Sequence, residues 1–436
     1  MPDPSVFAGL TKGSEGRAVS TTMAMTTLLR DLMRDEAFGA RVVPIVPDEA
    51  RTFGMDSLFR EFGIYAPFGQ LYEPVDHELL LSYSESTDGQ LIEEGITECG
   101  SMSSFIAAGT SYANLGVPMV PFYSFYSMFG FQRTGDSIWS AADSRARGFL
   151  LGATAGRTTL AGEGLQHQDG HSQLLAASVP ACQAFDPAFA YELGAIIEDG
   201  LTRMYGHEDP LRNEDVFYYV TIYNELYEMP PQPDHVTDAD VVRGLYLWAD
   251  APDDENTPNR ATLLFSGSAQ GAVRAAADEL ADRWGVAVDL WSATSYKRLR
   301  EEALAVERLN RLHPMEAAEV PLITRLLADG EGPVVAVSDY LKLVPGQVAR
   351  WIPRPYHTLG TDGFGRSDTR DALRRFFEVD AGHVVVAVLH ALSRAGTIDP
   401  AVVAEAIAHH GLDTEIADPG RADTVPEPGR SVGHED

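Results

Sequence analysis

The sequence has little basic charge and almost no cysteine. Against 64 Asp and Glu residues stand 33 Lys and Arg, which gives a formal net charge of −31 at pH 7. Binding the phosphates of nucleic acid needs clustered Lys and Arg, so this balance disfavours a nucleic-acid partner, whereas it favours solubility and suits a basic partner surface. The two cysteines, Cys99 and Cys182, are too few for a disulfide framework or a cluster of thiolate metal ligands. We therefore expect a reducing, cytoplasmic setting.

Long apolar runs and phosphate-binding motifs are also missing. No stretch of 18 or more apolar residues predicts a membrane span, and the N-terminus lacks the basic start and apolar core of a secretory signal. The sequence contains no GxGxxG motif, no Walker A loop and no GxSxG elbow. It therefore offers no loop of its own that would anchor a nucleotide or a phosphorylated cofactor.

Reactive side chains, in contrast, are concentrated between residues 45 and 172. This part contains the acidic turn PDEARTFG (47–54), the segment EEGITE (93–98), the aromatic run FYSFYSMFGFQR (122–133) and the loop GEGLQHQDGHS (162–172). Carboxylates, tyrosines and paired histidines at this density indicate half of an active site. Since a phosphate loop with its metal ligand is missing, we expect a subunit that completes its chemistry with a second chain.

Hydrophobic periodicity divides the chain into two α/β units. Strands alternate with helices in both, which predicts two domains of mainly parallel sheet flanked by helices. The predicted boundaries are a flexible arm (1–17), a first domain (18–228), a linker (229–240), a second domain (241–412) and a disordered acidic tail (413–436).

Individual elements follow from the same patterns. Helices are expected where apolar or small residues recur at helical spacing, over residues 20–35, 103–116 and 272–285. Strands are expected where apolar, β-branched and aromatic residues form short runs, over residues 41–50, 117–125, 216–224, 261–269, 286–293, 332–340 and 383–392.

The HQDGH sequence places His167 and His171 four residues apart, as in the helix of zinc proteases. However, Gln168 stands where that motif needs a glutamate as general base. Gly164 and Gly170 also disfavour a helix, because an interior glycine costs about 1 kcal/mol relative to alanine. A metal site is therefore not predicted here. Two interpretations remain, a loop histidine used for substrate binding or proton transfer and a purely structural histidine.

Glu98 ends a run of glutamates that begins at Glu93. Such a run is typical of a solvated acidic helix face. Yet Glu98 is followed by Cys99, Gly100 and further small or apolar residues, so the chain enters the interior at this point. A carboxyl group at the edge of the interior can act as a proton relay.

Taken together, many segments resemble one family, the homodimeric bacterial type of pyruvate dehydrogenase E1, a thiamine-diphosphate enzyme. These segments are STTMA (20–24), VPIVPDEARTFGM (43–55), FGIYAP (62–67), LIEEGITE (91–98), PFYSFYSMFGFQR (121–133), GRTTLAGEGLQHQDGHS (156–172), YYVTIYNE (218–225), SDYLKLVPGQV (338–348) and LGTDGFGRSD (359–368).

The resemblance covers about residues 18–412 and only the C-terminal half of that family. It implies a thiamine-diphosphate-binding fold, with a pyrimidine-binding domain and a transketolase-type C-terminal domain. The family's diphosphate-binding domain, which holds Mg²⁺ and the diphosphate, and its E2-docking arm have no counterpart. The resemblance thus implies a split β-type subunit that pairs with an α-type subunit carrying the Mg²⁺ ligands, expected as α2β2.

The resemblance also implies roles around the cofactor. Glu98 matches the glutamate that hydrogen-bonds N1′ of the aminopyrimidine and so controls its tautomer, which is general acid–base catalysis through the cofactor. Ile96 matches the apolar wedge that keeps the cofactor bent. Phe129 matches the aromatic residue beside the pyrimidine ring. Asp48 is expected at the active centre and is grouped with the cofactor-binding residues.

On the substrate side, the resemblance assigns Tyr126 and Glu49 to the lining of the active centre, together with Asp48. His167 matches the histidine that contacts the substrate carboxylate or the covalent intermediate. Gln168 departs from the family, because an acid is expected there. We expect this change to alter the charge beside His167.

Two enzymatic functions and one non-enzymatic function remain open. The first is decarboxylation of a 2-oxo acid, pyruvate, with transfer of the two-carbon unit to a lipoyl group. The second is a split transketolase-like or E1-like enzyme of specialised metabolism. It would move a glycolyl or acetyl unit from a ketose phosphate or keto acid to a carrier protein. The third, a structural remnant without cofactor, is disfavoured because Glu98, Tyr126, Phe129 and His167 are all present.

Overall fold

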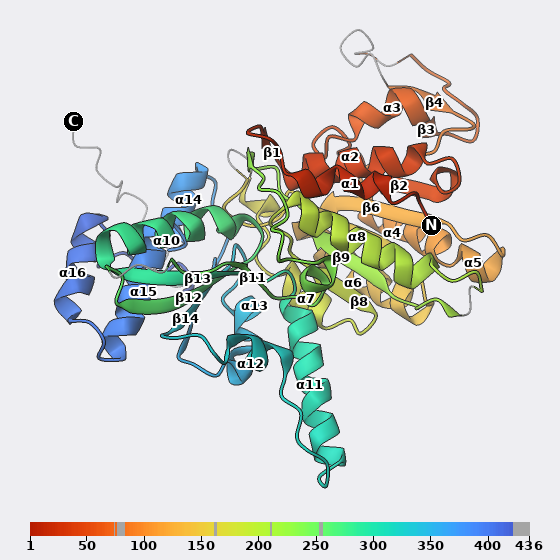
Figure 1. The fold of residues 1–436 in the computed structure, drawn as a ribbon. Helices are drawn as coiled ribbons and strands as arrows, with labels where there is room; N and C mark the ends of the chain where they lie inside the picture. Colours follow the sequence, from red (N-terminus) through yellow and green to blue (C-terminus); the bar gives the residue numbers. More distant parts are fainter. Residues whose placement is uncertain (74, 76–82, 161–163, 210–211, 253–255, 422–436) are drawn as a thin grey trace.

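Two open β-sheets with helices packed around them form the core of the protein (Figure 1). The computed structural model describes residues 1–73, 75, 83–160, 164–209, 212–252 and 256–421. Both sheets are mainly parallel. The predicted fold class is therefore confirmed.

The first sheet has six strands in the order β5-β2-β6-β7-β9-β8, and every neighbouring pair is parallel. Its central strands are almost wholly buried on both faces, as expected for a parallel sheet covered by helices. The strands are β2 (Val42–Val46), β5 (Ile92–Glu93), β6 (Val120–Tyr126), β7 (Gly148–Ala153), β8 (Cys182–Phe185) and β9 (Phe217–Thr221).

Successive residues of these strands belong to different hydrophobic clusters. Val42 and Val46 join the cluster that contains Leu28 of α2, whereas Val43 and Ile45 join a second cluster on the opposite face. The first cluster lies under α2 (Thr21–Arg34) and α8 (Ala190–Tyr205), and the second under α4 (Glu98–Gly109) and α6 (Ser127–Asp143).

The second sheet has five strands in the order β11-β13-β12-β14-β15, and β11 is its antiparallel edge strand. The strands are β11 (Tyr246–Ala249), β12 (Asn259–Phe265), β13 (Val286–Ser292), β14 (Val334–Val337) and β15 (Tyr356–Leu359). The main helices around it are α10 (Gln270–Trp284), α11 (Tyr296–Leu312), α12 (Leu322–Leu327), α13 (Leu343–Gly346), α15 (Ala381–Arg394) and α16 (Pro400–His409).

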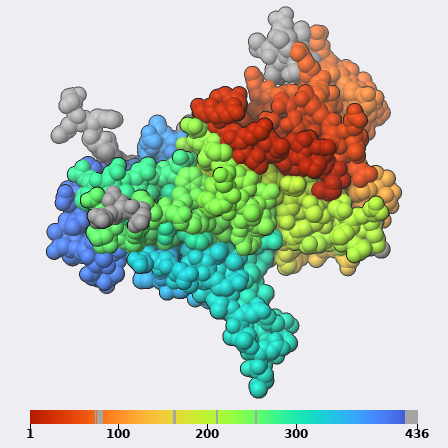
Figure 2. Space-filling view, in the orientation of Figure 1, coloured from red at the N-terminus to blue at the C-terminus, as the bar shows by residue number. Residues whose placement is uncertain are grey.

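Helix α11 extends away from the rest of the molecule as a rod, which is plain in the ribbon and in the space-filling view (Figures 1 and 2). The remaining short elements connect the main ones. They are α1 (Ser5–Ala8), α3 (Asp56–Phe62), α5 (Ser111–Asn114), α7 (Ser172–Ala177), α9 (Asp238–Val242), α14 (Arg370–Phe376), β1 (Ala18–Val19), β3 (Ile64–Tyr65), β4 (Glu85–Ser86) and β10 (Tyr227–Glu228).

The strand predicted over residues 383–392 is wrong, because this segment forms helix α15. Asp380 caps the helix by accepting a hydrogen bond from the backbone N–H of His383 at 2.9 Å. The buried positions follow a helical period, with Val384, Val388 and Leu392 on the face towards the core. A run of valines suggested a strand, whereas the capping residue and this burial period match a helix.

The flexible arm predicted for residues 1–17 is also wrong. Helix α1 lies against α2 and α8, and Phe7 is buried there. Ser14 is held at the other end of this segment, since its N–H donates to the carbonyl oxygen of Met229 at 3.0 Å and its hydroxyl accepts from the N–H of Met229 at 2.9 Å. Burial of Phe7 and this exchange of hydrogen bonds anchor a segment that composition alone suggested was loose.

The predicted linker and tail are only partly free of structure. Residues 229–240 contain the buried Met229 and lead into α9, which packs on α8. Residues 413–421 of the predicted disordered tail are described, and the backbone of Pro419 lies directly against Gly363, which has φ +92°. Residues 422–436 lie outside the described residues.

The helical stretch Arg370–Arg394 is long and apolar enough to cross a membrane, with a mean hydropathy of 1.4 over its 18-residue window. Half of that window is buried inside the protein. Val384, Val385 and Val388 pack in the same cluster as the strands of the second sheet. The stretch is therefore accounted for by the short helix α14 and the core helix α15, which residues 377–380 separate.

Candidate active site

An aromatic cluster forms where β6 ends and α6 begins. The ring of His167 lies 4.6 Å from that of Tyr126 and 5.2 Å from that of Phe129, measured between centroids. Tyr126 is the last residue of β6, and Phe129 is in the first turn of α6. Ligands of open α/β sheets bind beyond the carboxyl ends of the strands. The cluster therefore lies where the fold favours a site.

Glu98 is the first residue of α4, and only 7% of it is exposed. Thr97 caps this helix by accepting a hydrogen bond from the N–H of Gly100 at 3.1 Å, so the helix must begin at Glu98. A carboxylate is stabilised at a helix N-terminus because the backbone N–H groups there carry partial positive charge. The local sequence thus holds a buried acid in a fixed place.

Arg133 connects Glu98 to the aromatic cluster. Its Nη1 donates to Glu98 Oε1 at 2.6 Å, and its guanidinium carbon lies 3.8 Å from the ring centroid of Phe129. Sequence reasoning did not single out Arg133. The signal was its position four residues after Phe129 on one helix, a spacing that puts two side chains on the same face.

The acidic turn approaches the cluster from β2. The ring of Phe53 contacts that of Tyr126 edge-on at 5.3 Å. The backbone N–H of Asp48 donates to Glu49 Oε2 at 3.2 Å. Burial raises the pKa of Glu49, and the charge of Asp48 adds to this effect. Phe53 of the acidic turn therefore contacts the aromatic cluster, and the burial of Glu49 favours a bound proton.

Glu93 belongs to the same acidic group, although sequence reasoning gave it no role. Its pKa is raised to about 7, first by burial and then by the charges of Asp48, Glu85 and Glu49. A carboxyl with such a pKa can take up or release a proton near neutral pH. The sequence signal was its place at the end of β5, the edge strand next to β2.

Ile96, unlike the buried Glu98, is exposed at the surface. Its side chain is 78% exposed and lies on the loop between β5 and α4, two residues before Glu98. Exposure of a large apolar side chain beside a buried acid suits contact with a ligand or with another chain. Its role as a wedge stays a prediction.

The side chain of Gln168 bonds the second domain, and its expected effect on the charge beside His167 stays a prediction. Only 1% of Gln168 is exposed. Its amide nitrogen donates to the carbonyl oxygen of Arg366 at 2.5 Å, and its amide oxygen accepts from the N–H of Arg366 at 2.6 Å. An amide satisfies both the N–H and the carbonyl oxygen of one residue, which a carboxylate cannot do.

The two histidines of HQDGH face different partners. His167 lies against Tyr126 and Phe129, whereas His171 Nε2 contacts the side-chain amide of Gln132. The fully buried Asp169 between them accepts hydrogen bonds from the backbone N–H groups of His171 and Ser172, both at 2.9 Å. Asp169 thus fixes the turn before α7, and the structure gives the aspartate a structural role.

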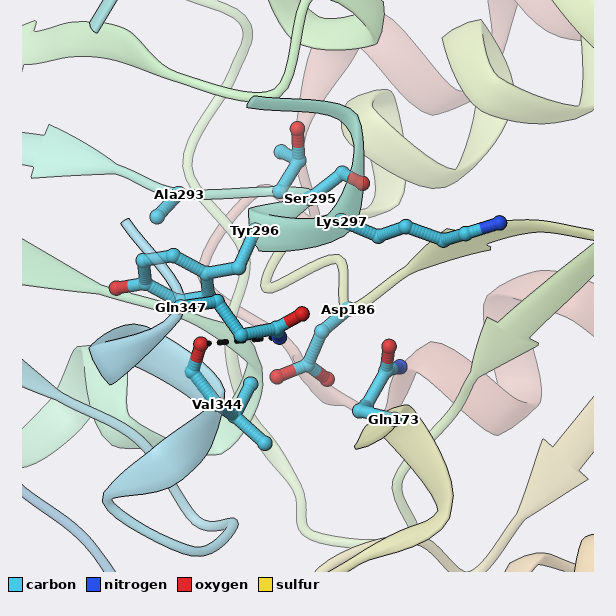
Figure 3. A pocket seen from close by; sticks show the side chains of 9 residues that line it. Gln173, Asp186, Ala293, Ser295, Tyr296, Lys297, Val344 and Gln347 are labelled. Atoms are coloured by element: carbon cyan, nitrogen blue, oxygen red, sulfur yellow. Dashed lines mark hydrogen bonds between the residues drawn. The ribbon is translucent and has the colours of Figure 1, made fainter. Parts of the chain in front are cut away.

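A cavity between the two domains is too small to be the active site. It measures about 10 Å³, roughly the room that one water molecule needs. Asp186 and Gln173 from the first domain line it together with Lys297 and Gln347 from the second (Figure 3). Asp186 Oδ1 accepts from the hydroxyls of Thr221 and Tyr223, and burial raises the pKa of this carboxyl. The cavity therefore belongs to the polar contact between the domains.

Comparison with known proteins decides the family. A family model described as the pyruvate dehydrogenase E1 component middle domain matches residues 2–230. The chain belongs to the pyruvate dehydrogenase E1 family. A second model, the transketolase-like TK C-terminal domain, matches residues 244–380. The family resemblance stated from the sequence is therefore confirmed.

Curated relatives extend the match to almost the whole chain. A pyruvate dehydrogenase E1 component from Mycolicibacterium smegmatis is 54% identical over 413 residues, which cover 95% of this chain and 44% of the relative. One from Escherichia coli K12 is 46% identical over 420 residues, which cover 96% of this chain and 46% of the relative. The chain thus spans a little under half the length of these relatives.

Solved structures show the same fold at low sequence identity. Transketolase from Leishmania mexicana superposes with a TM-score of 0.64 and 17% identity, covering 90% of this chain and 48% of that one. A structure described as a split gene transketolase, inactive beta4 tetramer, gives a TM-score of 0.55 and 18% identity, covering 86% of this chain and 98% of that one. These likenesses establish the transketolase-like arrangement of the two domains.

Proposed function

We propose that this chain supplies the aminopyrimidine side of a thiamine-diphosphate site in a pyruvate dehydrogenase E1 enzyme. The observation that supports this most is the buried Glu98 at the start of α4, joined through Arg133 to the rings of Phe129, Tyr126 and His167. Glu98 lies in a domain that matches the E1 middle domain. The reaction would be decarboxylation of a 2-oxo acid, pyruvate, with transfer of the two-carbon unit to a lipoyl group.

The residues present fit an aminopyrimidine. The carboxyl group of Glu98 and the ring of Phe129 lie close together, since both contact Arg133. The carboxyl group matches the polar edge of an aminopyrimidine, and the ring matches its flat face. When bound, thiamine diphosphate supplies the electron sink for cleavage beside the carbonyl group. Glu98 would hold the proton at the ring nitrogen, and Phe129 and Ile96 would pack against the cofactor. Because Arg133 already bonds Glu98 Oε1, it must share that oxygen with the aminopyrimidine or release it when the cofactor binds.

The substrate would be held by the residues on the other side of the aromatic cluster. His167 and Tyr126 offer polar groups that can bind a substrate carboxylate, and their rings are in contact. Glu49 and Glu93 hold protons more readily than ordinary carboxyls. We propose that Glu49 and Glu93 take up and release protons on the substrate side of the site, and that Asp48 belongs to the same side.

Diphosphate and Mg²⁺ are proposed to bind to a domain outside this sequence. The chain covers 44% and 46% of the two relatives, and both matched domains are accounted for without a phosphate-binding loop. We propose an α-type subunit that carries this domain, an α2β2 assembly, and a lipoyl or acyl carrier domain as acceptor. The structure described as a split gene transketolase is matched over 98% of its own length, which is consistent with a separate subunit of this extent.

The alternative, a split transketolase-like enzyme, rests on the partial extent of the chain and on Gln168, which stands where an acid is expected. We propose pyruvate as the donor, because the domain that carries Glu98 matches the pyruvate dehydrogenase E1 middle domain. A ketose phosphate is the alternative donor that the activity assay tests.

Calorimetry and activity assays test the proposal in two steps. The 436-residue chain by itself should bind thiamine diphosphate weakly and without dependence on Mg²⁺. Tight Mg²⁺-dependent binding would refute the need for a second diphosphate-binding domain. Combined with a diphosphate-binding E1 domain, the chain should decarboxylate pyruvate. Turnover of xylulose 5-phosphate, without turnover of pyruvate, would instead support the ketol-transferring enzyme.

A further inference from the structure

Glu279, His409 and His410 converge between α10 and the C-terminal end of α16. These two helices lie at the end of the second domain and take no part in the candidate active site (Figure 1). Glu279 Oε1 lies 3.0 Å from His410 Nε2 and 3.9 Å from His409 Nε2. The potential ligand atoms of all three residues lie within 4.8 Å of one another. Across the part of the chain that the structure describes, this is the one such group of His, Cys, Asp and Glu.

Neighbouring residues fix these orientations. A Cβ atom at position 382 would lie 2.8 Å from Cγ and 2.9 Å from Nδ1 of His410, so Gly382 of α15 makes room for that ring. The Nδ1 edge of His410 therefore faces α15, and Nε2 is left to face Glu279. Trp284 Nε1 donates to Glu279 Oε1 at 3.0 Å, which holds the carboxylate. Oriented ligands of this kind are typical of metal sites.

The chemistry of the group favours a cation over a simple ion pair. His409 is the last residue of α16 and His410 its C-cap, at the helix end with partial negative charge. The ring centroids of His409 and His410 lie 4.9 Å apart, beside the carboxylate of Glu279. Two imidazoles and a carboxylate are good ligands of zinc-class cations.

We propose that Glu279, His409 and His410 bind a divalent cation of the zinc class, which fastens α16 to α10. Two histidines and a glutamate form an established ligand set for Zn²⁺, with a fourth position left for water. Bonds of about 2.0 Å in a tetrahedral site place ligand atoms about 3.3 Å apart, so shifts of about 1 Å would close the site. The cation stabilises the docking of the C-terminal helix, because it binds the folded protein and not the separated helices.

Zinc titration of the untagged 436-residue chain, freed of metal by a chelator, tests the site. Calorimetry should show one Zn²⁺ per chain, and Zn²⁺ should raise the Tm. Co²⁺ in its place should give the intense visible absorption of a tetrahedral site. The variants Glu279→Gln and His410→Asn should each lose at least about tenfold in Zn²⁺ affinity. Gly382→Ala, which displaces the ring of His410, should weaken binding as well.

A matched control is available on α11 and the loop that follows it. His313 and Glu316 form an exposed pair at 3.4 Å without a third ligand, so His313→Asn should keep wild-type Zn²⁺ affinity. Absence of one-to-one binding, or unchanged binding in Glu279→Gln and His410→Asn, would overturn the proposal. So would an equal loss of Tm in Glu279→Gln with and without Zn²⁺, because that result describes an ion pair alone.

Discussion

Replacing Gln168 by glutamate should weaken the contact between the two domains while the fold persists. The side chain of Gln168 bonds both the carbonyl oxygen and the N–H of Arg366, at 2.5 Å and 2.6 Å. A carboxylate keeps the bond from the N–H and loses the donor. It would also place a buried negative charge against the carbonyl oxygen of Arg366.

The size of the effect follows from these two losses. The missing hydrogen bond is worth about 1 kcal/mol, and the second oxygen of the new carboxylate, buried without a donor at position 168, costs about 1–3 kcal/mol more. We therefore expect Gln168→Glu to lower the free energy of unfolding by about 2–4 kcal/mol at pH 8. Nearby links, such as the N–H of Leu341 to the carbonyl oxygen of Gly170 at 2.8 Å, still join the domains.

Urea unfolding at pH 8 and pH 5 measures this effect, with Gln168→Met as the matched control. Burial beside the Arg366 carbonyl should raise the pKa of a glutamate at 168, since the charged form is disfavoured. The destabilisation should therefore be full above that raised pKa and shrink as the pH falls, because a protonated carboxyl can donate to Arg366. Gln168→Met loses both bonds at either pH. A Gln168→Glu protein as stable as wild type at pH 8 would refute the reasoning.

Two further predictions concern the interior of the first domain. Because the pKa of Glu93 is raised to about 7 in the folded protein, its charge destabilises the fold as the pH rises from its ordinary value of 4.5 through 7. Glu93→Gln should then stabilise the protein by about 1 kcal/mol at pH 8, after allowance for solvent screening, and less at pH 5 in urea unfolding; equal effects at both pH values would contradict this. Gly130→Ala should lower the Tm, because its Cβ would lie 1.9 Å from Cε2 of the buried Phe125, and overpacking costs about 1–3 kcal/mol. The control on the same helix is Gly135→Ala, which meets nothing within 4 Å and should not destabilise, so a similar loss in both variants would remove the packing explanation.

The fold was predictable where short apolar runs alternate with capped helices. The helix expected over residues 20–35 corresponds to α2, which Ser20 caps, and the run at 117–125 corresponds to β6. The failure at α15 has a physical cause. Consecutive valines satisfy a buried helix face as well as a strand, and periodicity could not separate them over so short a run.

The residues of the candidate site came from the family resemblance, and their roles stay predictions. The structure brings Tyr126, Phe129 and His167 into contact, which residue types alone did not show. Contacts between residues of the two domains could not be predicted from the sequence. The bond between Gln168 and Arg366 joins residues 198 positions apart, and no local pattern marks Arg366 as the partner.

The same limit applies to the proposed cation site. His409 and His410 are adjacent in the sequence, but Glu279 lies on a helix about 130 positions earlier, and no ligand spacing connects them. Only the packing of α10, α15 and α16 brings them together. Local spacing rules find metal sites on one segment and miss sites assembled by tertiary structure.

The role proposed for Glu98 is tested most directly by hydrogen–deuterium exchange at C2 of thiamine diphosphate. The measurement uses this chain with a diphosphate-binding E1 domain at saturating cofactor and Mg²⁺. Glu98→Gln should slow exchange by about 100-fold or more, the usual contribution of a general acid–base group. Glu94→Gln, which changes a neighbouring carboxyl bonded to Ser104, should exchange at the wild-type rate. Wild-type exchange in Glu98→Gln would contradict the assignment of this chain to the pyrimidine side of the site.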